Sequence, residues 1–557
     1  MGFSAARDYG RCPLAILAAQ PGERALGKRW NGWGRDTEEH PLGTRRLQFL
    51  AERIGSATPA VSASRSTALQ AVGASRLPAS SYFDTDAATR LDHAFGQSLP
   101  DWIALRSGRT AACADGVACP ATHDDALAAL AEARRLGAIV IPYGGGTSVV
   151  GHLRVARSER PVVNVSLERL SGLQAVDPTQ LTATFGAGTP GPAIEAALAP
   201  HGLTLGHYPQ SFELSTAGGW VATRSSGQQS LRYGRIEQLF HGGKLVTPRG
   251  TLVVGGLPAS AAGPDLREAV LGSEGRLGLL TDLTLRVRPA AAHERFHAIF
   301  FPDWASGLQA MRELAQSGAG LSMLRYSCPT ETETQLALVE GHERALAWLG
   351  RYRRWRGVDR GACLLMAGVT GSEREAREAR AALLAAARVQ RGVHVGTALG
   401  RGWVKNRFAS PYLRNSLWDA GIAVETVETC VPWAQAGAML NAFEAAGAAA
   451  LAADGERVHT CTHLSHVYRQ GCSVYTTFVY RLAADPDANL ERWRRLKAAA
   501  SEAIVAIGGS ISHQHGVGID HAPYLAAEKG ELGLALLRAM ARELDPDGMM
   551  NPGKLFA

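Results

Sequence analysis

Histidines and a tyrosine in the C-terminal part of the chain are the residue types best suited to move protons. His513 and His515 stand in the glycine-flanked run 508–518, GGSISHQHGVG, and Tyr475 ends the run 465–475, SHVYRQGCSVY. Imidazoles exchange protons near neutral pH and also ligate metals. A phenol with a pKa of ~10 acts as a base only where a neighbour takes its proton or a positive charge stabilises the phenolate.

The spacing of the two histidines leaves their role open. A metal site is disfavoured, because no third ligand follows at a recognisable spacing. A structural histidine pair fits the spacing as well as an acid–base pair does. The sequence alone therefore predicts no metal and does not decide between the other two roles.

Three polar, glycine-rich segments in the first half are suited to binding phosphates through the backbone. They are residues 141–148, IPYGGGTS; residues 209–234, PQSFELSTAGGWVATRSSGQQSLRYG; and residues 271–278, LGSEGRLG. Consecutive glycines permit positive φ and let backbone N–H groups converge on a diphosphate. The first segment is neither a P-loop nor a Rossmann fingerprint. Taken singly, each segment is equally compatible with a turn or a surface loop.

Helices and short strands alternate around these segments. Apolar periodicity predicts helices over residues 124–136, 373–389, 433–453 and 490–507. Branched and aliphatic runs predict strands over residues 138–142, 161–165, 181–185, 244–246, 252–254, 279–287, 362–369 and 474–481. The pattern indicates an α+β domain ending near Pro289, followed by a second α+β domain.

Composition restricts the classes of partner. The 58 Lys and Arg residues exceed the 51 Asp and Glu residues by seven, which favours an anionic substrate or membrane surface. No Lys/Arg block has the density of a nucleic-acid tail, so we expect no nucleic-acid binding. The run 341–357, GHERALAWLGRYRRWRG, interleaves aromatics with arginines. It fits either a helix lying on an anionic bilayer or a solvated helix with a half-buried face.

In this order, the three glycine-rich segments resemble the FAD-binding domain of the vanillyl-alcohol oxidase/PCMH flavoproteins. Within that superfamily the chain resembles the alkylglycerone-phosphate synthase (alkyl-dihydroxyacetonephosphate synthase) family. The resemblance begins at RWNGWG, residues 29–34, and is most specific in STAGGWVATRSSG, TPRG and GSEGRLG. It implies an α+β fold with a PCMH-type two-part FAD-binding domain, a second α+β substrate (cap) domain and an N-terminal helical or irregular extension. The expected parts are the extension (1–112), the FAD-binding domain (113–290), the cap (291–500) and a C-terminal segment completing the active site (501–557).

The resemblance implies FAD as a non-covalent cofactor. Covalent members of the superfamily commonly carry a histidine in the first glycine loop, where this chain has Thr147, and His152 nearby is expected to be structural. The expected FAD contacts are Pro142, Tyr143, Gly144, Gly145, Gly146, Thr147 and Ser148; Gln210, Ser211, Phe212, Glu213, Leu214, Ser215 and Thr216; Thr223, Arg224, Ser225 and Ser226; and Gly272, Ser273, Glu274, Gly275, Arg276, Leu277 and Gly278.

The resemblance also implies five residues for catalysis and substrate binding. Tyr475 aligns with the family's catalytic tyrosine, and His513 and His515 are expected to tune it. Arg325 matches an arginine important for activity, and Arg414 matches the substrate arginine, whose guanidinium suits a phosphate dianion.

One position departs from the family. The family has three consecutive histidines where this chain has Gln514 in the middle. Glutamine forms hydrogen bonds but exchanges no proton near neutral pH. Synthase activity is therefore expected if the middle position only forms hydrogen bonds, and a different activity if it must titrate.

The implied reaction is a redox-neutral exchange of the acyl group of acyl-dihydroxyacetone phosphate for a long-chain fatty alcohol. The partners are then small lipid substrates, with peripheral membrane contact and a homodimer also expected. An FAD-dependent dehydrogenase or oxidase of a 2-hydroxy acid or alcohol is the alternative, and a non-catalytic flavoprotein or membrane-associated scaffold is the third. The chain ends in KLFA and not in a peroxisomal SKL, and its composition is typical of a bacterial cytoplasmic protein. We therefore expect a cytoplasmic protein, peripheral at the inner membrane face.

Overall fold

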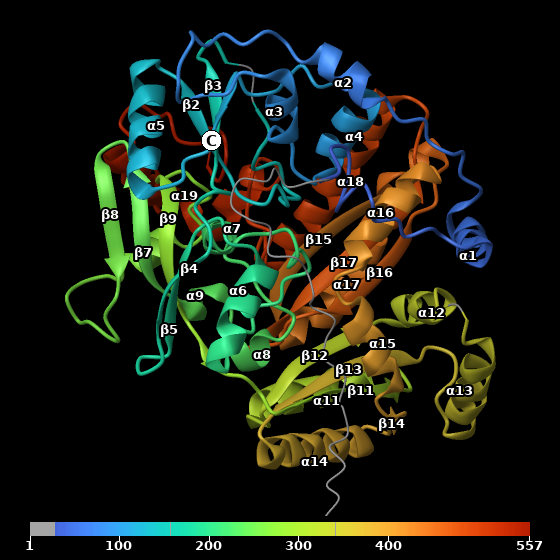
Figure 1. The fold of residues 1–557 in the computed structure, drawn as a ribbon. Coiled ribbons are helices and arrows are strands. Elements are labelled where there is room, and N and C mark those ends of the chain that lie inside the picture. The colour runs from blue at the N-terminus through green and yellow to red at the C-terminus, as the bar shows by residue number, and fades with distance from the viewer. Residues whose placement is uncertain (1–27, 156–157, 340, 557) are drawn as a thin grey trace, which may run out of the picture.

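The computed structural model describes residues 28–155, 158–339 and 341–556, and Figure 1 shows its arrangement. The first 27 residues of the expected extension lie outside these ranges. Two sheets form the first half of the chain. The parallel sheet has the order β1 (Gly116–Ala118), β3 (Val162–Ser166), β2 (Ile139–Tyr143). The antiparallel sheet has the order β4 (Leu173–Asp177), β5 (Thr182–Gly186), β9 (Leu279–Arg286), β7 (Phe240–Thr247), β8 (Gly250–Gly255).

Helix α5 (His123–Arg135) packs against strands of both sheets. It begins with a capping box in which Thr122 and Asp125 exchange side-chain and backbone hydrogen bonds. A short antiparallel pair, β6 (Leu203–Thr204) with β10 (Arg288–Pro289), joins the middle of this half to its C-terminal end. The α+β class and the two-part organisation predicted for this half are confirmed.

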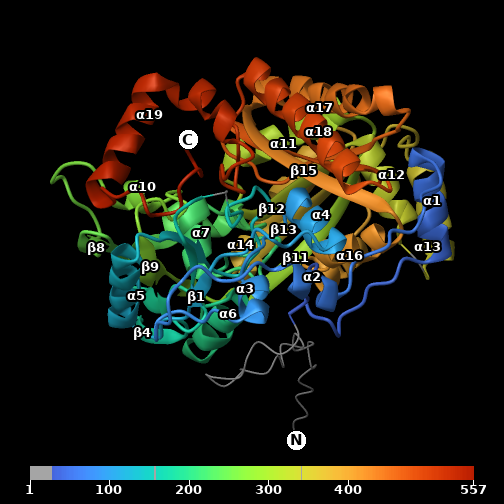
Figure 2. The same ribbon diagram turned by 90° about the horizontal axis from the view of Figure 1, so that it is seen from above.

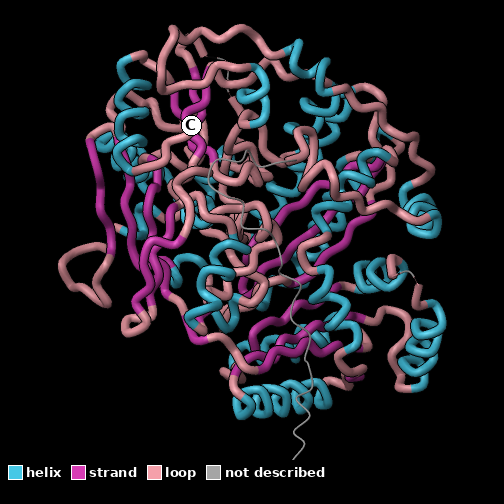
Figure 3. Tube along the Cα trace, in the orientation of Figure 1, coloured by secondary structure: helices cyan, strands magenta, loops and turns pink. Residues whose placement is uncertain are grey.

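A seven-stranded antiparallel sheet forms the second half, and Figure 3 shows its strands in magenta. Its order is β14 (Val393–His394), β11 (His293–Phe301), β13 (Cys363–Gly371), β12 (Leu321–Ser327), β16 (His459–Leu464), β17 (Gly471–Arg481), β15 (Ile422–Pro432). Helices α11 (Trp304–Ser317) and α14 (Glu373–Val389) pack at β11 and β13, whereas α17 (Ala436–Ala450) and α18 (Pro486–Ile507) pack at β15 and β17.

The two ends of the described chain connect the halves (Figure 2). Near the N-terminus lie α1 (Thr44–Ile54), α2 (Arg65–Ala71), α3 (Ala87–Asp92) and α4 (Leu99–Ser107), of which α3 contacts β1 and α4 contacts α18. After α19 (Leu525–Leu544) the chain returns to the first half, where Met550 pairs with Val140 of β2 in a parallel bridge. The last residues therefore extend the parallel sheet.

The remaining helices are short and lie mainly in connections. They are α6 (Gly191–Leu198), α7 (Ala217–Thr223), α8 (Ser230–Tyr233), α9 (Ile236–Leu239), α10 (Arg267–Val270), α12 (Pro329–Ala337), α13 (Glu343–Trp355), α15 (Ala398–Asn406) and α16 (Ser410–Asp419).

The segment Trp433–Asp454, which contains α17, is long and apolar enough to cross a membrane by length and composition. Met439 and Phe443 of α17 are nevertheless fully buried, and the helix packs against α18 and β17. We interpret α17 as a core helix. Its Phe443 belongs to the same continuous hydrophobic cluster as Phe185 of β5, so one core spans both halves.

Candidate active site

The segments expected to contact FAD meet through their backbones. A Cβ on Gly145 would lie 1.9 Å from the carbonyl oxygen of Leu214, so the first glycine segment touches the second. A Cβ on Gly275, which has φ +75°, would lie 2.6 Å from Pro142 Cγ, so the third touches the first. Such close approaches admit only glycine. The glycines thus hold the three segments together around a common backbone-lined site.

A cavity of about 450 Å³ lies next to this site and is lined by residues that include Thr223, Gly272 and His513. The buried Ser226 hydroxyl has no hydrogen-bond partner among the described residues. Glycine-lined backbone and a free hydroxyl suit the diphosphate and the polar chain of FAD. The residues present therefore fit this cofactor.

Two carboxylates within the expected FAD contacts bind the protein itself. Glu213 accepts a hydrogen bond from Tyr412 Oη at 3.0 Å. Glu274 accepts hydrogen bonds from the backbone N–H groups of Val517 and Gly518, and its Oε2 lies 2.9 Å from His152 Nε2. Both side chains therefore position neighbouring segments of the protein.

Strand register brings Tyr475 beside two residues that the sequence did not indicate. Tyr475 of β17 pairs with Glu428 of β15 on one side and with His463 of β16 on the other. Directly paired residues point to the same face of a sheet. The Tyr475 ring stacks on His463 with centroids 4.9 Å apart and meets His515 edge-on at 5.9 Å. His515 is thus a direct neighbour of the tyrosine.

Burial raises the pKa of Tyr475 to about 12, so the phenol is neutral near pH 7. A hydrogen bond with Thr426 and the charge of Arg325 act in the opposite direction. Arg325 is therefore the cation that can stabilise a phenolate at Tyr475.

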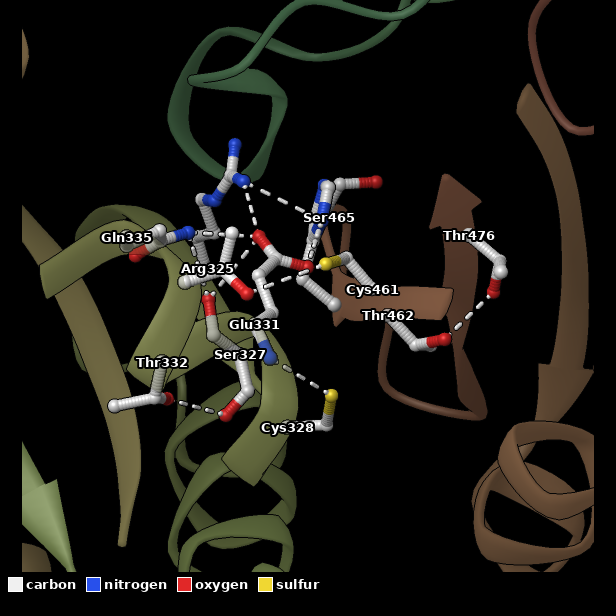
Figure 4. A network of polar contacts seen from close by, with 12 residues as sticks. Arg325, Ser327, Cys328, Glu331, Thr332, Gln335, Cys461, Thr462, Ser465 and Thr476 are labelled. Atoms are coloured by element: carbon white, nitrogen blue, oxygen red, sulfur yellow. Dashed lines mark hydrogen bonds and ion pairs between the residues drawn. The ribbon is translucent and has the colours of Figure 1, made fainter. Parts of the chain in front are cut away.

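Arg325 is held by a buried carboxylate, as Figure 4 shows. Its Nη2 donates to Glu331 Oε1 at 2.7 Å, and the other carboxylate oxygen lies 2.9 Å from His463 Nδ1. Burial alone would raise the pKa of Glu331, but the charges of His463 and Arg325 outweigh it and lower the pKa to about 2. One anion thus orients both the arginine and the imidazole that stacks on Tyr475.

His513 contacts a different tyrosine from the one expected. Its Nε2 lies 2.6 Å from Tyr468 Oη and 2.7 Å from Arg235 Nη1, whereas its Nδ1 lies 3.2 Å from Glu428 Oε1. Because a guanidinium only donates, Nε2 is an acceptor and Nδ1 carries the proton. Burial lowers the pKa of His513 to about 4, so the ring is neutral. His513 therefore contacts Tyr468, and not Tyr475 as direct tuning of Tyr475 would require.

Glu428, His466 and His513 have the residue types of a metal site, and their ligand atoms lie within 4.8 Å of one another. The Nδ1 atom that His513 offers, however, carries a proton and has no lone pair for a metal. Burial would raise the pKa of Glu428, but its interactions with His513 and His466, hydrogen bonds among them, lower it well below its usual range. These residues form a hydrogen-bonded cluster around an ionised carboxylate.

Arg414 of α16 lies over an aromatic ring. Its guanidinium carbon is 4.5 Å from the centroid of Trp102, and its Nη1 donates to the carbonyl oxygen of Gln97. Its Nε is buried without a hydrogen-bond partner among the described residues. Arg414 also interacts electrostatically with Tyr475. The expected phosphate ligand thus lies near the expected proton carrier and retains an unused donor.

The sequence interpretation missed the buried and half-buried side chains that orient these residues. They are His207, Glu331, Glu428, His463, His466 and Tyr468. Glu428 lies on β15, whereas His463, His466 and Tyr468 lie on β16 and in its connection to β17. His207 is a buried histidine whose Nε2 lies 3.2 Å from Ser225 Oγ. The one available signal was Glu425 and Glu428 within the otherwise strand-like run 422–432, IAVETVETCVP, because buried strands seldom carry charge.

Known proteins match the chain over most of its length. The family model described as an FAD binding domain matches residues 114–256, and that described as FAD linked oxidases, C-terminal domain, matches residues 290–555. The alkyldihydroxyacetonephosphate synthase of Dictyostelium discoideum is 30% identical over 477 residues, covering 85% of this chain and 78% of that protein. The one from Caenorhabditis elegans is 32% identical over 486 residues, with 85% and 81% covered. A solved structure of an alkyldihydroxyacetonephosphate synthase superposes with a TM-score of 0.80 at 26% identity, covering 95% of this chain and 98% of the other.

Proposed function

The chain belongs to the alkyldihydroxyacetonephosphate synthase family of FAD-dependent enzymes, and from this premise we propose that it forms an ether bond by exchange. The acyl group of acyl-dihydroxyacetone phosphate leaves as a fatty acid, and a long-chain alcohol takes its place. Bound FAD supplies a reversible electron sink, so that no net electrons leave the site.

Tyr475 carries the proposal. Its neutral phenol lies among His463, His515 and the charges of Arg325 and Arg414. A neutral phenol can give its proton to a leaving carboxylate, and a nearby cation stabilises the phenolate that then accepts the proton of the alcohol. Proton transfer in both directions is what a redox-neutral exchange requires.

Arg414 is the proposed phosphate ligand. Contact with Trp102 and the Gln97 carbonyl fixes its guanidinium, and Nε remains free to donate. A fixed fork of donors beside a permanent charge suits a phosphate dianion better than an ammonium does. We also propose that FAD is not covalently attached, since Thr147 follows the glycines of the first segment.

Helix α13 supports the proposal of peripheral membrane contact. Its Trp348 and Trp355 side chains are 62% and 79% exposed, and the helix buries none of its residues. Large exposed tryptophans between arginines suit the interface of an anionic bilayer. A bilayer would deliver both lipid substrates to a cytoplasmic enzyme at the inner membrane face.

The test uses FAD-loaded protein under anaerobic conditions with acyl-dihydroxyacetone phosphate and labelled hexadecanol. Labelled ether product with the flavin oxidised at the end supports the exchange. Absence of ether product together with lasting flavin reduction by a 2-hydroxy acid would overturn it in favour of a dehydrogenase.

A further inference from the structure

Gln514, which occupies the middle position of the histidine segment, has a definite partner. Its Nε2 donates to Glu428 Oε2 at 2.6 Å. The other oxygen, Oε1, accepts a hydrogen bond from Ser465 Oγ at 2.6 Å and lies 3.2 Å from His513 Nδ1. Glutamine can therefore form the hydrogen bonds of a side chain at the middle position, but it cannot exchange a proton there.

A third imidazole reaches the same carboxylate from another part of the chain. His466, between β16 and β17, places Nδ1 3.4 Å from Glu428 Oε1, and its ring centroid is 4.9 Å from that of His513. Its backbone is fixed by a hydrogen bond from its N–H to Ser473 Oγ at 3.0 Å and by one from Ser473 N–H to its carbonyl oxygen at 2.8 Å. His466 is 5% exposed, so its position is determined by the protein interior.

The two imidazoles at Glu428 differ in whether Nε2 has a hydrogen-bond partner. Nε2 of His513 contacts Tyr468 and Arg235, whereas Nε2 of His466 is buried without a hydrogen-bond partner among the described residues. A structural histidine satisfies both nitrogens, since an unmatched buried polar group costs free energy. His466 also interacts electrostatically with His207, whose Nδ1 is likewise unpartnered and whose Nε2 contacts Ser225, an expected FAD contact. The His466 imidazole is therefore coupled electrostatically to a histidine that contacts one of the expected FAD segments.

We infer that His466 supplies the third imidazole of the site, in place of the middle histidine that Gln514 replaces. The inference rests on the proposed function. His466 and Gln514 together provide one imidazole and one amide at Glu428. His466 acts as a positioning residue, because it shares the Glu428 carboxylate with His513 and so fixes the surroundings of that ring. An imidazole from the connection between β16 and β17 thus replaces the one that the histidine segment lacks at Gln514.

Exchange of the two side chains tests this directly. The four proteins are the wild type, His466→Gln, Gln514→His and the double variant, all loaded with FAD and assayed for ether product. We expect His466→Gln to lower kcat at least about tenfold with little change in KM, as loss of an interaction that matters only in the transition state does. The double variant should recover to within about threefold of the wild type, because coupled residues are not additive. A His466→Gln protein with wild-type kcat, or a double variant no more active than His466→Gln, would overturn the inference.

A second readout keeps this test separate from the proposed function. Nitrogen-15 spectra of the histidines should report the Nδ1–H tautomer of His513 in the wild type, a changed ring in His466→Gln and restoration in the double variant. An unchanged His513 signal in His466→Gln contradicts the inference even if the wild type makes no ether product. His297→Gln, at a buried histidine 3.1 Å from His394 on the far edge of the same sheet, is the matched control and should change neither readout.

Discussion

Glu331 is the residue whose replacement should disturb both the stability and the chemistry of the site. It is 6% exposed and serves as the anion for Arg325 and His463. Lowering a carboxyl pKa from 4.5 to about 2 corresponds to about 3 kcal/mol of stabilisation. Because the folded-state pKa is depressed, this stabilisation is fully present above the unfolded-state value and is lost as pH falls through the folded-state value.

Glu331→Gln should therefore lower the free energy of unfolding by about 3 kcal/mol at pH 7.5, with the difference shrinking towards pH 3.5. Glutamine also turns an N–H₂ group towards the donors of Arg325, so kcat should fall as Tyr475 loses its oriented cation. Urea unfolding of both proteins at several pH values measures the first effect, and initial rates of product formation measure the second.

Glu333, two residues further along α12, provides the matched control. Its carboxylate pairs with Arg53 at the surface and its side chain is 59% exposed. Exposed pairs contribute about 0–1 kcal/mol, so Glu333→Gln should be nearly silent. If the urea midpoint of Glu331→Gln equals that of Glu333→Gln at pH 7.5, the assignment of Glu331 as a buried anchor is refuted.

Three other changes test separate parts of the molecule. Burial raises the pKa of Asp520 to about 6, against the opposing charge of Arg154, so stability is lost as pH rises through that value. The cost of ionising Asp520 in the folded protein is about 3 kcal/mol at pH 8 and about half of that at pH 5. Asp520→Asn should then raise the melting temperature more at pH 8 than at pH 5, and equal shifts at both pH values would contradict this. Arg414→Ala should raise KM for the phosphorylated substrate while FAD content, read from flavin absorbance, stays constant; an unchanged KM removes Arg414 from the site. Replacing Trp348 and Trp355 by Ser should reduce co-sedimentation with anionic vesicles, and retained binding would exclude α13 as the membrane contact.

Elements with strong local signals were predictable from the sequence. Helix α14 spans Glu373–Val389, as predicted, because Ser372 and Glu375 form a capping box before a periodic run. Helix α19 was not predicted, since Gly530 interrupts it with φ +66° and breaks the helical pattern. The predicted helix over residues 433–453 is α17 with a 3₁₀ turn at each end, a boundary that composition does not mark.

The candidate site was predictable only where one short segment carries the signal. The types and spacing of residues in the glycine-rich segments predict contacts made through the backbone. The groups around Tyr475 come instead from strands β12, β15 and β16, which are distant in sequence and adjacent only after the sheet forms. The expectation that His513 adjoins Tyr475 assumed that two residues in one short run share a partner. The structure separates them, because His515 faces Tyr475 and His513 faces Tyr468.

Strand register at β15 and β17 therefore decides whether the site exists. Glu428 and Tyr475 lie side by side only if β17 begins at Gly471 opposite Pro432. A Cβ at Gly471 would lie 2.1 Å from the carbonyl oxygen of Val431, so only glycine permits the two strands to meet at this point. A shift of one residue would turn Tyr475 to the opposite face, away from Glu428 and His463. The glycine that precedes the tyrosine in the sequence is thus as necessary to the proposed chemistry as the tyrosine itself.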